Sequence, residues 1–107
     1  MVIKLNIFGR ILLGNILPQK GSITQLLAAR DIKKLVELTR EEIAAIKLRD
    51  GATPGSIEWD GTVPEAQPKD FTFKDSEIKL IKDTITDLSN KGLLQQEHLF
   101  LYDLFMA

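Results

Sequence analysis

The stretch DGATPGSIEWDGTVPEAQPKD, residues 50–70, decides the architecture because it separates two segments of helical character. It contains three of the four prolines, three of the seven glycines and the single tryptophan, Trp59. Proline and glycine disfavour helix interiors, so no helix is expected here. In residues 57–59 (IEW) and 71–73 (FTF), apolar and polar side chains alternate as in half-buried strands. We therefore predict that these triplets pair as a small antiparallel β-hairpin, with residues 60–70 as its loop.

The chain length favours one domain. Its 107 residues, of which 44% are hydrophobic, suffice for one hydrophobic core. Each half beside the break has only about 50 residues, a size at which independent domains become marginal. The hairpin is therefore expected to join both halves into one core that includes Trp59. We predict a mainly helical α+β fold of about five helices: a helical part over 6–48, a hairpin and loop over 50–74, and a helical pair over 75–106.

Helix boundaries follow from capping signals, since side chains of Asn, Ser and Thr accept hydrogen bonds from free backbone amides at helix starts. Asn6 predicts a helix to about Leu17, where Pro18 ends it. Gly9 and Gly14 each weaken this helix by about 1 kcal/mol, so close packing is expected to hold it. Further starts are predicted at Ser22 with Gln25, at Thr39 with Glu42, at Asp75 or Ser76, and near Gln95, with a stop at Gly92.

Helical spacing also predicts the core faces of these helices. The predicted core residues over 22–48 are Ile23, Leu26, Leu27, Ile32, Leu35, Val36, Leu38, Ile43 and Ile46. The helix over 75–90 presents Ile78, Ile81, Ile85 and Leu88 at spacings of three and four.

Composition indicates the cellular environment in which the protein works. There are no cysteines, so disulfides and thiolate metal sites are excluded. No apolar run approaches the ~20 residues of a membrane span, and Arg10 interrupts the apolar N-terminal run with no cleavage site after it. We expect a soluble, unprocessed, cytoplasmic protein that makes no membrane contact.

Charge is divided between the two halves. Residues 1–50 hold nine Lys/Arg and five Asp/Glu, a net charge of +4, whereas residues 51–107 hold five and ten, a net charge of −5. Opposite halves can attract each other within one fold. The same division also suits two faces for two partners, or head-to-tail self-association.

No motif for catalysis or ligand binding is present. His98 is the only histidine, and a lone histidine near a helix start is typically a surface or capping residue. The serines lack a GxSxG setting, the glycines do not form a phosphate-binding loop, and the central acids lack EF-hand spacing. We predict that the protein is not an enzyme and that it has no catalytic, cofactor-binding or metal-ligating residue.

Two other features suggest contacts with partners. Phe100, Leu101, Leu104 and Phe105 cannot all face one core at 100° per residue, so they are candidates for partner contact, unless the first helix covers the other side of this helix.

Helices followed by a hairpin are similar to a winged helix-turn-helix, with Arg30, Lys33 and Lys34 as nucleic-acid contacts. Acids at 41 and 42 open the helix that would enter the groove and disfavour DNA binding.

The chain also resembles a group of small proteins of unknown function from tailed bacteriophages and prophages. The matching residues are Leu17, Pro18 and Gly21, then Leu94, His98, Leu99, Leu101 and Tyr102. The Pro-rich middle is longer here than in that group. The resemblance implies a phage protein of the bacterial cytoplasm or the virion, with no known activity. We expect a non-enzymatic accessory or assembly protein that binds a protein partner or itself; the alternative is a DNA-binding regulator.

Overall fold

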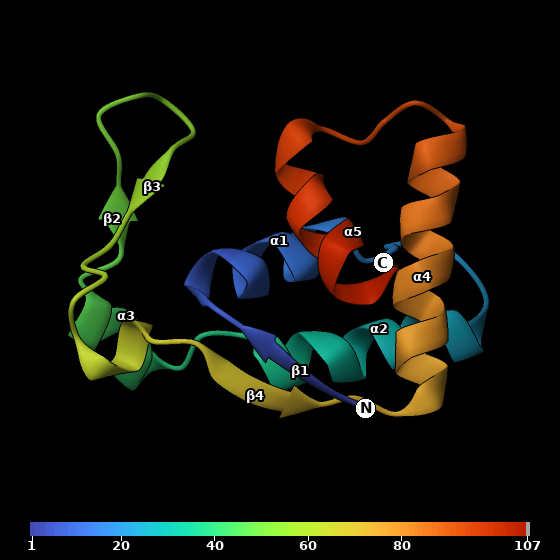
Figure 1. Cartoon of the computed structure of the whole chain (residues 1–107), viewed down its shortest axis with the longest axis horizontal. Helices are drawn as coiled ribbons and strands as arrows, with labels where there is room; N and C mark the ends of the chain where they lie inside the picture. The colour runs from blue at the N-terminus through green and yellow to red at the C-terminus, as the bar shows by residue number, and fades with distance from the viewer. Residues whose placement is uncertain (107) are drawn as a thin grey trace.

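The computed structural model describes residues 1–106, and helix α1 (Ile7–Ile16) lies in the middle of their fold. It packs between α2 (Ile23–Val36) and α5 (Leu99–Phe105), while α4 (Asp75–Asn90) packs against both of these helices (Figure 1). A short helix, α3 (Arg40–Ile46), follows α2, and 3-10 turns span Pro64–Ala66 and Gln96–His98. The prediction of a mainly helical α+β fold with about five helices is confirmed.

The first three helices begin where the capping residues predict. The Asn6 side chain accepts a hydrogen bond from the Gly9 amide at 2.8 Å. Ser22 with Gln25, and Thr39 with Glu42, form reciprocal capping boxes in which each side chain accepts from the other residue's amide. Each cap satisfies amides that have no partner within the helix.

The second half differs in one cap. The N-cap of α4 is Lys74, not Asp75 or Ser76, and its amide donates to the Glu77 carboxylate at 2.7 Å. The buried carboxylate of Glu77 thus takes the place of a capping side chain. Gly92 ends the helix with a φ of +67°, a conformation that glycine adopts without steric cost. His98 Nδ1 accepts from the Gln95 amide at 2.9 Å, so the lone histidine has a capping role at the start of the last helix.

The strand pairing corrects the predicted hairpin. Strand β1 (Val2–Leu5) pairs antiparallel with β4 (Lys69–Thr72), which places the buried side chains of Ile3 and Phe71 opposite each other. A separate hairpin joins β2 (Arg49–Asp50) to β3 (Ile57–Glu58). The two predicted strands therefore belong to different sheets. The buried Ile3 of β1 pairs with the buried Phe71 of β4, while Ile57 pairs locally with Asp50 and stays 41% exposed.

The apolar residues of α2 are also placed differently from the expectation. Ala29, Ile32 and Val36 face the main core, but Ile23, Leu26, Leu27 and Leu35 are exposed, with Ile23 at 77%. The core stripe is narrow because α2 contacts the body along one side only. Ile46 is buried as predicted, in a small second cluster with Ile7 and Ala66, and the half-buried Trp59 packs against it. Within residues 1–106, no helix is long and apolar enough to cross a membrane.

Candidate functional site

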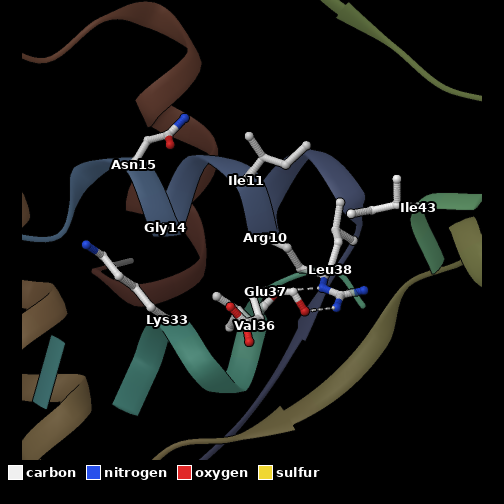
Figure 2. A pocket seen from close by; sticks show the side chains of 9 residues that line it. All are labelled: Arg10, Ile11, Gly14, Asn15, Lys33, Val36, Glu37, Leu38 and Ile43. Carbon is white, nitrogen blue, oxygen red and sulfur yellow. Dashed lines mark hydrogen bonds between the residues drawn. The ribbon is translucent and has the colours of Figure 1, made fainter. Parts of the chain in front are cut away.

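Two hollows share the lining residue Lys33: the first lies between α1 and α2, and the second lies between α2 and the turn that follows α1. We call the two hollows together the α1–α2 groove. The first hollow, of about 360 Å³, is lined by Arg10, Ile11, Gly14 and Asn15 of α1, by Lys33, Val36 and Glu37, and by Leu38 and Ile43 (Figure 2). The second, of about 390 Å³, is lined by Pro18, Gln19, Leu26, Ala29, Arg30, Lys33 and Lys34. Apolar side chains and small residues thus form most of the groove, and cations lie along one side.

The three basic residues considered for nucleic-acid contact lie together at this groove. Arg30, Lys33 and Lys34 are all exposed and all line the second hollow. Arg30 contacts Asp31 at 4.0 Å, but both side chains are at least half exposed, so this pair neutralises the patch only weakly. The second hollow therefore has a net positive rim.

The two glycines of α1 have different roles. A Cβ at Gly9 would lie 2.7 Å from the Phe100 ring, so Gly9 allows the close packing of α1 against α5 that the sequence predicts. A Cβ at Gly14 would meet nothing within 4 Å, so internal packing does not require this glycine. Gly14 lines the first hollow, and its missing side chain leaves that hollow open.

A buried ion pair supports the groove from below. Arg10 Nη1 donates to Glu42 Oε2 at 2.6 Å and Nη2 to Oε1 at 3.0 Å. The same guanidinium donates to the carbonyls of Val36 and Glu37, both at 2.8 Å, at the C-terminal end of α2 (Figure 2). Lys69 adds a third contact to Glu42, at 2.9 Å. This network joins α1, α2, α3 and β4, so the groove has a rigid base.

Electrostatics explain why this base is stable in its charged form. The hydrogen bonds from Arg10 lower the pKa of Glu42 far below its ordinary value, and this effect outweighs the desolvation that raises it. Among residues 1–106, no buried side-chain nitrogen or oxygen lacks a hydrogen-bond partner. The donors of Arg10 bind Glu42, Val36 and Glu37. Arg10 therefore stabilises the groove and has no role in binding a ligand.

Sequence reasoning missed this network. The only local signals are a cation inside the apolar run of residues 7–17 and an acid at the third position of a helix. Neither signal shows that two residues 32 positions apart meet.

The last helix corrects the predicted partner contacts. Leu101 and Phe105 are buried in the main core, and Phe100 and Leu104 are half-buried against it. Phe100 makes an edge-on contact with Phe8, at 6.1 Å between ring centroids. The exposed side of this helix carries Leu99, Tyr102 and Asp103 instead, which we call the α5 outer face.

Carboxylates are scattered over the surface and bind neighbours. Asp83 and Asp87 line a 440 Å³ hollow between α4 and the end of α1, and each pairs with a lysine one turn away. Asp60 accepts hydrogen bonds from Thr62, mainly from its hydroxyl, which lower the pKa of Asp60. In residues 1–106, no three His, Cys, Asp or Glu side chains lie close enough to hold a metal ion. The chemistry that the α1–α2 groove offers is binding through apolar contact and positive charge.

Comparison of the chain with protein-family models, with curated proteins and with solved structures found no match.

Proposed function

We propose that this protein is a non-enzymatic accessory or assembly factor that binds a segment of another protein chain in the α1–α2 groove. The observation that carries the proposal is the pair of adjacent hollows that share Lys33. Their apolar lining offers pockets for anchoring side chains, and their cations offer partners for carboxylates. The expected partner segment therefore combines apolar side chains with acidic ones.

Gly14 supports this proposal. A glycine inside a helix costs about 1 kcal/mol relative to alanine. No internal contact requires one at this position, and its effect is to keep the first hollow open. A binding role for the hollow explains that cost.

The resemblance to small phage proteins extends the proposal to a setting. A role in assembly or as an accessory factor would place the protein in the bacterial cytoplasm or in the virion. That setting is a prediction from the residues at Leu17, Pro18 and Gly21 and in the last helix.

Differential capture tests the proposed function. The wild-type protein, Gly14→Leu and Lys33→Glu are immobilised beside Lys82→Glu, which reverses an exposed charge on α4, away from the groove. A true partner is retained by the wild type and Lys82→Glu and lost from both groove variants. Hydrogen exchange on the recovered complex then has to show protection of residues 10–15 and 26–38. A partner retained equally by all four proteins contradicts the proposal.

DNA binding is the second candidate, favoured by the exposure of Arg30, Lys33 and Lys34 on one helix. Three phosphate contacts would give a slope of about −2.7 for log K against log salt. Fluorescence anisotropy with a labelled duplex measures this slope for the wild type and for the triple alanine variant. No binding at low salt, or equal binding by the triple variant, ends this hypothesis.

A further inference from the structure

The α5 outer face has the chemistry that the α1–α2 groove is expected to bind. We infer that it docks into the groove of a second copy of this chain, so that copies associate head to tail. This inference rests on the proposed function, because it takes the groove to be a site for a protein segment and names the segment.

The α5 outer face is apolar and acidic. Leu99 and Tyr102 are 51% and 43% exposed, and Asp103 is exposed beside them. Residues three and four apart lie on the same side of a helix, so these side chains form one surface. Over residues 92–106 the charged side chains are the two carboxylates Glu97 and Asp103, with no lysine or arginine.

The groove complements this face in charge. Arg30, Lys33 and Lys34 line its second hollow, and the only carboxylate that lines either hollow is Glu37. Apolar side chains from α5 would enter hollows lined by Leu26, Ile11 and Leu38, while Asp103 lies near the lysines. Opposite charges across such an interface fix its orientation and speed association.

Within one chain the two surfaces cannot meet. Phe8 and Gly9 of α1 contact Phe100 of α5, whereas Ile11 and Gly14 line the first hollow, and no residue of α5 lines either hollow. Figure 1 likewise places α5 and α2 on opposite sides of α1. A segment that fills the groove must therefore come from another molecule.

The charge pattern also selects the symmetry. A two-fold contact of groove with groove would bring the three cations against their own copies, which is repulsive. A head-to-tail contact brings them to Asp103 of the next molecule. Such heterologous contacts make a ring when the rotation closes and an open chain when it does not. The two halves of the sequence carry net charges of +4 and −5. Of the explanations for this division, the charges on the two surfaces favour head-to-tail self-association.

Two charge reversals test the inference on the full chain. Lys33→Glu disables the groove and leaves α5 intact, whereas Asp103→Lys disables the α5 outer face and leaves the groove intact. Sedimentation equilibrium at low salt is expected to give the wild type an average mass that rises with concentration beyond twice the monomer. Each variant is expected to associate at least about ten-fold more weakly, equivalent to a loss of about 1.4 kcal/mol. Lys82→Glu and Asp50→Lys, reversals at exposed sites elsewhere, are expected to associate like the wild type.

Mixing the two variants gives the decisive result. The intact α5 outer face of Lys33→Glu can enter the intact groove of Asp103→Lys. The two reversed surfaces also carry opposite charges, so they can pair as well. The mixture is therefore expected to associate more strongly than either variant alone. Circular dichroism confirms that each variant is folded.

The outcomes separate this inference from the proposed function. A wild type that stays monomeric at the highest accessible concentration overturns self-association, while groove-dependent capture of another protein would still stand. Association that both variants retain also overturns it, because the contact then lies elsewhere. Weakened variants whose mixture associates no more strongly than either variant alone exclude the head-to-tail arrangement.

Discussion

Arg10 and Glu42 form two parallel hydrogen bonds, at 2.6 and 3.0 Å, that join α1 to α3. Both side chains are less than a tenth exposed. The guanidinium also lies over the ring of Phe71, 5.2 Å from its centroid. One charged pair therefore connects the base of the groove to the sheet of β1 and β4. Its removal should lower the stability of the whole fold.

Glu42→Gln is expected to destabilise the protein by about 3 kcal/mol, because it leaves the buried Arg10 charge without its counter-ion. Urea denaturation followed by circular dichroism measures the free energy of unfolding. The matched control is Glu41→Gln, which removes an exposed acid from the same first turn and should cost at most about 1 kcal/mol. Equal losses from the two variants would show that the ion pair adds nothing beyond the helix dipole.

Acid should unfold the protein partly through Glu42. The pKa of Glu42 is lower in the folded state than in the unfolded state, where it is about 4.3. Its contribution to stability is therefore complete above that value and is lost as the pH falls toward the folded-state pKa. The difference in unfolding free energy between wild type and Glu42→Gln should narrow from about pH 5 to about pH 2. A constant difference over this range would contradict the assignment.

Alanine at the two glycines of α1 should have effects of opposite sign. Gly14→Ala is expected to stabilise the protein by about 0.5–1 kcal/mol, since alanine is the better helix former and has free space there. Gly9→Ala is expected to destabilise it by about 1 kcal/mol or more, because its methyl group would collide with Phe100. Thermal melting of both variants checks this contrast. If both variants gain stability, the packing of Phe100 on Gly9 is not as tight as described.

The small cluster around Ile46 can be followed through Trp59, the only tryptophan. Ile46→Ala is expected to cost about 3 kcal/mol, because Ile46 is fully buried beside Ile7 and Ala66. Tryptophan fluorescence during urea unfolding reports this loss directly. Ile57→Ala, at an exposed position of the neighbouring hairpin, serves as the control and should cost under about 1 kcal/mol. A similar cost for both would show that Ile46 contributes no more to stability than an exposed isoleucine.

Much of the helical part of the fold was predictable because helix ends are local. Asn6, Ser22 and Thr39 each accept a hydrogen bond from an amide three residues ahead, and Gly92 adopts a turn that few other residues allow. Such contacts depend on neighbours in the sequence. The α4 cap was misplaced by one or two residues because the Glu77 carboxylate competes with the usual capping side chains.

The sheet and the groove were not predictable because they join distant residues. Residues 57–59 and 71–73 share an alternating pattern, but the pattern does not identify the partner strand, and β4 pairs with β1. The exposed leucines of α2 have the same spacing as core leucines, and only the placement of α1 and α4 decides which side is buried. The three cations were identified as possible contacts, whereas the hollow beside them arises from packing.

The pairing of β1 with β4 also sets an order of events during synthesis. Residues 2–5 are made before their partners at 69–72, which follow more than sixty residues later. At about 5–20 residues per second, the first strand waits for several seconds with Ile3 and Leu5 uncovered. The helices α1 to α3 can form in that interval from local contacts, but the sheet that closes the core cannot. Completion of this fold is therefore a late step, because β4 and the core helices α4 and α5 are all made after this interval.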